Sequence, residues 1–170
     1  MANKYYIADL HIGHKNMANK RGFTDAEAMF NYIKEKWNKK VKKQDMVYIL
    51  GDVTMERRRD IKRLAELNGN KIVILGNHDR PEDSKELLKY ALKLAGMIKY
   101  KNMFMTHCPV HEREFEYRIK YNIHGHIHED FVMKKFLGIP YAKDKRYICV
   151  SCEHVDYTPK SLEELGILPG

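Results

Sequence analysis

Residues 71–79 read KIVILGNHD. An apolar run gives way to a glycine and then to three polar residues, which is typical of a short buried strand that ends in a turn. Residues 46–52, MVYILGD, repeat this pattern. Residues 5–11, YYIADLH, form a third such run and carry Asp9 and His11 at its end. The sequence therefore predicts several strands that each deliver polar side chains to one place.

Amphipathic segments separate these strands. Thr24–Glu27 reads as a capping box before a helix. The apolar stripe of that helix is Ala26, Met29, Phe30, Ile33, Trp37 and Val41. Further helices are predicted at Arg58–Leu67 and Ser84–Ala95. The predicted strands are Tyr5–Leu10, Met46–Leu50, Lys71–Leu75, Met97–Tyr100, Met103–Thr106, Tyr121–Ile123 and Arg146–Val150. This order predicts an α/β sandwich with mixed sheets.

Residues 124–128, HGHIH, contain three of the nine histidines of the chain. The segment follows a predicted strand, and alternate residues of a strand lie on one face. His124, His126 and His128 would then point the same way if the strand continued. Neutral imidazole is the commonest protein ligand for metals. The pentapeptide alone favours a metal site only slightly over a chance cluster.

The bulk composition is that of a globular protein. The 170 residues fit one domain, residues 1–170, and the net charge of +8 favours polyanionic partners. Much of that charge is explained by lysines on the solvated face of the first long helix. Cys149 and Cys152 lie three residues apart on or just after a strand, so they face opposite ways and predict no zinc site.

The expected location is cytoplasmic. An odd number of cysteines, three, is simplest in a reducing compartment. The first residues carry Asp9, His11 and His14 where a signal peptide needs an apolar core. No stretch approaches the length of a membrane span, so we expect no membrane partner.

Metal-ligating residue types recur wherever a predicted strand ends. They are Asp9, His11, Asp52, Asn77, His78, His107, His126 and His128. Each one alone has an ordinary explanation, since an Asp or Asn after a strand is usually a turn former. Ligand sites of α/β sheets, however, lie at the carboxyl ends of strands. Eight such residues at five strand ends therefore predict one metal site.

Five short motifs carry a resemblance to a known family. DLHIGH, GDV, GNHD, THCP and GHIH, in this order between Asp9 and His128, resemble the five signatures of the calcineurin-like metallophosphoesterases. Shorter matches, among them Trp37-Asn38 and the C-terminal VSCEHVDYTPKSLEEL, resemble a small bacterial and phage-type branch. The resemblance implies a four-layer α/β/β/α sandwich with two mixed sheets and a metal site at the C-terminal ends of the strands.

The resemblance also implies the roles of individual residues. Asp9, His11 and His128 would hold one metal ion, Asn77, His107 and His126 would hold a second, and Asp52 would bridge the two. His78 would stand near the leaving group as the catalytic residue, and His124 would have a structural role. Mixed carboxylate, imidazole and amide ligands suit two divalent ions of Mn, Fe, Zn or Ni. A neutral amide at Asn77 keeps the site electropositive towards phosphate.

Other residues have open roles. His14 is expected either to reach a substrate or to pack the first loop, and Arg21 or the run Arg57–Arg59 to contact phosphate. Asp79 is expected either to orient His78 or to form a turn. Cys108 is predicted to be a small buried filler. Residues 129–145 lack clear periodicity, so they are expected to form a loop over the site or an irregular connection.

The function that these observations favour is hydrolysis of a phosphate ester by a hydroxide held between two metal ions. A phosphodiester is the favoured substrate, because the chain leaves little room for a cap domain. The basic charge fits a nucleotide or nucleic acid. The alternatives are a phosphomonoesterase of the same fold, a non-catalytic metal-binding scaffold, and a nucleic-acid-binding module whose metals are structural.

Overall fold

The computed structural model describes residues 2–167. Its first sheet has the order β1-β2-β3-β4, formed by Lys4–Ile7, Met46–Leu50, Asn70–Ile74 and Lys93–Ala95. All three pairings in this sheet are parallel. The prediction of two mixed sheets is therefore wrong for this sheet. Because the strands are parallel and in close register, Ile7, Ile49 and Val73 align, and the carboxyl ends of β1, β2 and β3 meet at one edge.

The second sheet has the order β10-β7-β6-β5. Its strands are Tyr147–Cys149, Tyr121–His124, Met103–Thr106 and Met97–Tyr100. Here β5 runs antiparallel to β6, while the other pairings are parallel, so this sheet is mixed as predicted. Buried Asn122 ties β7 to the neighbouring segments: it donates to Thr106 Oγ1 at 2.9 Å and accepts from the Val110 amide at 2.9 Å.

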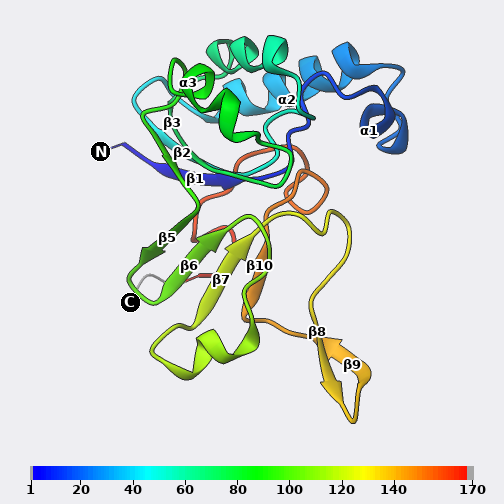
Figure 1. Cartoon of the computed structure of the whole chain (residues 1–170), viewed down its shortest axis with the longest axis vertical. Helices are drawn as coiled ribbons and strands as arrows, with labels where there is room; N and C mark the ends of the chain where they lie inside the picture. The colour runs from blue at the N-terminus through cyan, green and yellow to red at the C-terminus, as the bar shows by residue number, and fades with distance from the viewer. Residues whose placement is uncertain (1, 168–170) are drawn as a thin grey trace.

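The two sheets meet where β1 and β10 end. The amide of Ala8 donates to the Val150 carbonyl at 2.8 Å, and the amide of Cys152 donates to the Ala8 carbonyl at 3.1 Å. These bonds form an isolated parallel bridge between Ala8 and Ser151. The carboxyl ends of both sheets therefore face one region of the molecule, which Figure 1 shows between the blue and orange segments.

The helices cover the first sheet (Figure 1). They are α1 (Lys15–Lys20), α2 (Ala26–Lys40), the 3₁₀ helices η1 (Arg58–Glu66) and η2 (Pro81–Asp83), and α3 (Ser84–Leu87). The predicted stripe of α2 lies against the core, with Met29, Phe30, Ile33 and Trp37 fully buried. Its cap is Asp25, whose carboxylate accepts from the Ala28 amide at 2.8 Å, so the helix begins one residue later than a capping box at Thr24 predicts.

Two predicted helices differ in the structure. The segment Arg58–Leu67 forms η1, a 3₁₀ helix rather than an α-helix. The prediction of a helix over Ser84–Ala95 is wrong, because α3 ends at Leu87 and Lys93–Ala95 is strand β4. Pairing of Ile72 with Lys93 adds this segment to the sheet, and the backbone bonds gained there outweigh local helix propensity.

The second sheet has no comparable helical cover. Among residues 88–167, the structure contains only the 3₁₀ helix η3 (Glu112–Glu116), and the four-layer sandwich is therefore not confirmed. Residues 129–145, predicted as a loop or irregular connection, contain an antiparallel hairpin of β8 (Met133–Phe136) and β9 (Ile139–Lys143). Figure 1 shows this hairpin projecting from the body of the molecule.

Buried apolar side chains from both sheets and from α2 belong to one cluster. Trp37 is the largest fully buried side chain, and its Nε1 donates to the Asn68 carbonyl at 2.9 Å. Asn38 bonds the same turn, through Glu66 O and the Asn68 amide. The Trp37-Asn38 pair thus fixes α2 to the turn before β3. Within the described residues, no helix is both long and apolar enough to cross a bilayer.

Replacing Trp37 with Phe should destabilise the fold by about 1–3 kcal/mol, since it leaves a cavity and an unpaired Asn68 carbonyl. Urea unfolding followed by circular dichroism measures the change. Tyr117→Phe, at a side chain 75 % exposed, is the matched control and should change the free energy of unfolding by less than about 0.5 kcal/mol. Equal stability of both variants would contradict the role of Trp37.

Candidate metal centre

The structure brings the seven predicted metal ligands together at the joined ends of the two sheets. Three ends of the first sheet contribute residues: Asp9 and His11 follow β1, Asp52 follows β2, and Asn77 follows β3. The second sheet contributes His107 after β6, and His126 and His128 after β7. The contributing loops converge because the Ala8–Ser151 bridge holds β1 beside β10.

One group of three ligands consists of Asp9, His11 and His128. One ligand atom of each lies within 4.8 Å of the others. The imidazoles of His11 and His128 stack with ring centroids 5.2 Å apart, and His11 Nε2 lies 4.0 Å from Asp9 Oδ1. The ligand atoms are too far apart to be hydrogen-bonded to each other, but they are close enough to surround one cation.

A second group consists of Asn77, His107 and His126. Asn77 Oδ1 lies 2.9 Å from His107 Nε2 and 3.0 Å from His126 Nδ1. Cys108 is exposed rather than a buried filler, and its sulfur lies within 4.8 Å of a ring nitrogen of both histidines. Both Asn77 and His126 are exposed, so this group opens to solvent.

Asp52 lies between the two groups. Its Oδ2 is 3.4 Å from His107 Nε2 and 3.8 Å from His11 Nε2. Its Oδ1 accepts a hydrogen bond of 3.0 Å from the amide of His78. One carboxylate oxygen therefore faces ligands of both groups while the other oxygen is held by the backbone.

Buried atoms without partners test whether these residues fit a metal. Asp9 Oδ1 and both ring nitrogens of His11 are buried and have no hydrogen-bond partner. An unpaired buried polar group costs about 1–3 kcal/mol, so native proteins rarely keep one without a function. Carboxylate and imidazole lone pairs that converge on one point fit a divalent transition-metal ion.

The remaining atoms of several ligands have partners that fix their orientation. His107 Nδ1 lies 2.8 Å from the Leu50 carbonyl, which only accepts, so Nδ1 carries a proton and Nε2 is the ring nitrogen that faces Asn77 and Asp52. His128 Nδ1 lies 3.1 Å from Glu153 Oε1. Ser151 donates to Asp9 Oδ2 at 2.6 Å. Outer partners of this kind orient metal-binding groups.

Glu153 and Ser151 were not predicted from the sequence. Both lie in the C-terminal stretch VSCEHV, whose resemblance to the bacterial and phage-type branch was the available signal. Serine and glutamate are too common in proteins for the residue type alone to indicate a role. The contacts appear only because the bridge to Ala8 carries this segment beside the first loop.

Burial and charge shift the acidities of the site. Burial lowers the pKa of His11 to about 3, so its imidazole is neutral and able to act as a ligand. Burial would raise the pKa of Glu153, but the bond to His128 and the Arg21 charge outweigh it and hold that pKa at about 2. Burial likewise opposes ionisation of Asp52, yet the hydrogen bond and charge of His107 lower its pKa overall.

Five of the ligand residues have left-handed backbone conformations. The φ angles are 58° at Asp9, 47° at His11, 53° at Asp52, 73° at His126 and 49° at His128. Non-glycine residues rarely adopt such angles, and in folded proteins they concentrate at functional sites. These angles also correct the expectation for HGHIH, because β7 ends at residue 124 and the three histidines do not alternate along a continued strand.

Glycines permit the loops to approach one another. A Cβ at Gly125 would lie 2.5 Å from Ala8 Cβ and 2.5 Å from Asp9 Oδ2, closer than real Cβ contacts. A Cβ at Gly76 would lie 2.3 Å from Asp52 Oδ1. The GDV, GNHD and GHIH motifs therefore need glycine for steric reasons, because a side chain at these positions would displace the ligands.

His78 lies beside the ligands but is bonded differently. Its side chain is 27 % exposed, its ring lies 6.0 Å from that of His11, and its Nδ1 is 3.7 Å from Glu56 Oε1. Asp79 does not hold the His78 ring. Instead, its carboxylate accepts from the amides of Asp52, Val53 and Gly76, which gives Asp79 the turn-forming role.

The two predicted substrate contacts occupy different positions. His14 is the cap of α1: its Nδ1 accepts from the Met17 amide at 2.8 Å, and its ring lies 5.9 Å from that of His11. Arg21 is 1 % exposed and donates to Glu153 Oε1 and to the Asp9 carbonyl, each at 2.8 Å. The Arg21 guanidinium thus fixes groups around the ligands and has little surface for a substrate.

The remaining open residues lie outside the ligand cluster. Arg57 and Arg59 line a hollow of about 340 Å³ together with Gly13. Arg58 lies 3.9 Å from Asp83. His124 is buried, with Nδ1 2.8 Å from the Gly125 carbonyl, and is not among the converging ligands.

Three comparisons relate this chain to known proteins. A sequence model of the calcineurin-like phosphoesterase family matches residues 5–101. An uncharacterised protein of Methanocaldococcus jannaschii is 30 % identical over 172 residues, which cover 96 % of this chain and 89 % of that protein. The gene 66 protein of Mycobacterium phage L5 is 26 % identical, covering 81 % of this chain and 83 % of that protein. The crystal structure of a protein of unknown function from Aquifex aeolicus aligns over 98 % of each chain, with a TM-score of 0.68 and 26 % identity.

Replacing Gly125 with Ala should weaken metal binding on the order of tenfold to a hundredfold, because the new methyl group displaces Asp9 and the following histidines. Titration of Mn²⁺ into metal-stripped protein by calorimetry measures the affinity. Gly96→Ala is the matched control, since no atom lies within 4 Å of its Cβ position. Wild-type affinity in Gly125→Ala would show that the close contact is unimportant.

Proposed function

Because this chain belongs to the calcineurin-like phosphoesterase family, we propose that it is a hydrolase that cleaves phosphate esters at a centre of two divalent transition-metal ions. The observation that carries the proposal is the set of buried, unpartnered atoms of Asp9 and His11 inside the converging ligands. Such atoms are expensive in a structural site and are explained when a cation accepts their lone pairs.

The geometry supports a division of the ligands. Asp9, His11 and His128 would hold one ion, Asn77, His107 and His126 would hold the second, and Asp52 would be shared between them. The shared role is supported by the position of Asp52 Oδ2, 3.4 Å from His107 and 3.8 Å from His11. The mixture of imidazole, carboxylate and amide groups favours Mn, Fe, Zn or Ni over Ca or Mg.

Two ions held by these residues would lower the pKa of a bound water, which would supply the nucleophile, and would stabilise charge on the phosphoryl oxygens. The protein's own residues keep the site receptive to an anion, because Asn77 contributes an oxygen without a negative charge. Glu153 and Ser151 orient His128 and Asp9, and Asp79 holds the backbone of the Asp52 turn.

His78 is the proposed general acid. Its backbone amide is anchored on Asp52 Oδ1, so its ring is held beside the ligands while remaining partly exposed to an incoming substrate. In this role, His78 donates a proton to the leaving oxygen as the bond between phosphorus and that oxygen breaks. His14, whose ring lies beside that of His11, is a substrate contact in this proposal.

The proposed substrate class is a phosphodiester. Exposure of Asn77 and His126 leaves the second group of ligands open to solvent, so an ester with a substituent on either side of phosphorus has room. The net charge of +8 favours a polyanionic substrate such as a nucleotide or nucleic acid. A non-catalytic scaffold is disfavoured because the ligand set is complete and His78 accompanies it.

Hydrolysis of bis(p-nitrophenyl) phosphate by metal-stripped protein should appear only after Mn²⁺, Ni²⁺ or Zn²⁺ is restored, and it should exceed hydrolysis of p-nitrophenyl phosphate. His78→Ala should lower kcat about 10²–10⁴-fold without loss of bound metal, since it removes the proton donor. Initial rates and metal content by mass spectrometry provide both readouts.

His111→Ala is the matched control, because His111 lies outside the ligand cluster at the start of η3. It should retain the wild-type rate. Full activity of His78→Ala would remove the proposed general acid. Absence of turnover on either ester with two ions bound would favour the scaffold.

A further inference from the structure

Residues 131–145, the basic arm, leave the body of the protein as the β8–β9 hairpin (Figure 1). Every residue of β8 is exposed, and every residue of β9 except Ala142 is exposed. A two-stranded hairpin that packs on nothing is only marginally stable in water. The arm therefore presents both of its faces to a binding partner rather than to a core.

The arm carries unpaired positive charge. Lys134, Lys135, Lys143 and Lys145 form no ion pair with any of the described residues. The single carboxylate of the arm, Asp144, is engaged by Arg146 at 2.6 Å. Lys143 also lies over the Phe131 ring, with its Nζ 3.0 Å from the ring centroid. A surface whose lysines form no ion pair and whose one carboxylate is bound by Arg146 is complementary to a polyanion.

Aromatic rings lie among these lysines. The exposed fractions are 70 % for Phe136 and 64 % for Tyr141, whereas the Phe131 ring contacts Lys143 and His154. Aromatic faces exposed beside cations are the feature on which the bases of single-stranded nucleic acids stack. The sequence did not bring these lysines and rings together, because the β8–β9 hairpin was not predicted.

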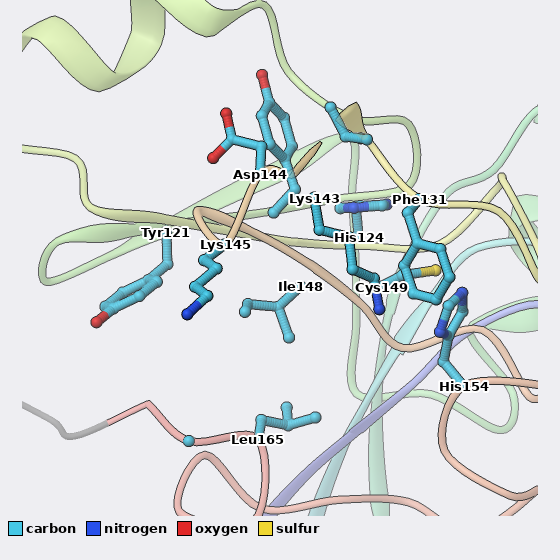
Figure 2. A pocket seen from close by; sticks show the side chains of 13 residues that line it. Tyr121, His124, Phe131, Lys143, Asp144, Lys145, Ile148, Cys149, His154 and Leu165 are labelled. Carbon is cyan, nitrogen blue, oxygen red and sulfur yellow. The ribbon is translucent and has the colours of Figure 1, made fainter. Parts of the chain in front are cut away.

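A cavity of about 590 Å³ lies at the base of the arm (Figure 2). Phe131, Lys143 and Lys145 of the arm line it together with Tyr121, Ile148 and His154. Figure 2 shows the Lys145 side chain extending towards Tyr121 and Ile148. Apolar, aromatic and lysine side chains in its lining, with the one carboxylate, Asp144, bound by Arg146, suit a planar base that carries a phosphate.

Residues of the arm and of the cavity are close in sequence to residues of the metal centre. Phe131 follows His128 by three residues. On the other side, His124 lines the cavity and precedes His126 by two residues. The base of the arm is therefore joined directly to the loop that carries two of the metal ligands.

We propose that the basic arm and the cavity at its base bind single-stranded nucleic acid and so present a phosphodiester backbone to the metal centre. The inference rests on the proposed function for its catalytic meaning, although the binding itself does not require metal. Single strands are favoured over duplexes because stacking on Phe136 and Tyr141 needs unpaired bases.

The test is fluorescence anisotropy of labelled oligo(dT) with metal-stripped protein in EDTA, so that no hydrolysis occurs. The double variant F136A/Y141A should weaken binding at least about tenfold. The double variant K134Q/K135Q should reduce the slope of log K against log salt by about 1.4, since each phosphate contact to a single strand contributes about 0.7.

Matched controls separate the arm from general charge. K39Q/K43Q removes the same charge from two exposed lysines elsewhere, and Tyr117→Ala removes an exposed ring. Both should bind like the wild type, and thermal unfolding should show all variants folded. Equal losses in arm and control variants, equal affinity for a duplex, or no oligo(dT) binding would each overturn the proposal.

Separate readouts distinguish this inference from the proposed function. Turnover of bis(p-nitrophenyl) phosphate by the wild type with no oligo(dT) binding would overturn the arm proposal alone. Arm-dependent binding without turnover on any ester would support the arm and contradict the hydrolase. A dimer in sedimentation that F136A/Y141A dissociates, with no oligo(dT) binding, would assign the arm to a second copy of the chain instead.

Discussion

Close approach of the loops after β2, β3 and β7 is the constraint on which the site depends. A Cβ at Gly51 would lie 2.3 Å from His107 Nδ1, and one at Gly76 would lie 2.3 Å from Asp52 Oδ1. Ligands from both sheets can share one small volume only if the backbones between them carry no side chains. The bridge between Ala8 and Ser151 sets the sheets close enough for this contact.

The same crowding accounts for the backbone conformations of the ligands. Turning a side chain into the shared volume immediately after a strand requires left-handed φ at Asp9, His11, Asp52 and two histidines. Each such residue costs about 1 kcal/mol or more, and the orphaned Asp9 and His11 atoms add to that cost. The large core around Trp37 and the fixed partners of His107 and His128 hold the arrangement in place. Packing in the rest of the fold thus offsets the free-energy cost of the strained backbone and unpaired atoms at the site.

The local sequence pattern predicted those helices and strands whose buried residues follow the period of the element itself. The strands at 46–50 and 71–75 were recognisable because they are buried, apolar and followed by glycine, and the α2 stripe because its period is helical. The segment 84–95 was mispredicted because its strand is created by pairing with β3, which no local pattern encodes. The exposed strands β8 and β9 lack the alternation of apolar and polar residues that marks a half-buried strand, so the hairpin could not be predicted either.

The ligands of the candidate site could be predicted from the sequence for a related reason. Ligands at strand ends are marked by residue type and position, and the motifs occur in one order along the chain. Partners such as Glu153 and Ser151 are specified only by the fold, as is the burial of Arg21, which turns an expected phosphate contact into a support for Asp9 and Glu153. The sequence therefore predicts what touches the metals better than what holds those groups.

The hydrogen bond from Ser151 to Asp9 joins residues 142 positions apart. On a ribosome, the first ligand, Asp9, therefore emerges well before the hydroxyl that orients it and before the carboxylate of Glu153. The centre is consequently completed only after the first sheet and its helices have been available to fold. A nascent chain that ends before Ser151 can contain much of the fold and still lack an assembled centre, which delays any metal chemistry until this segment has been made.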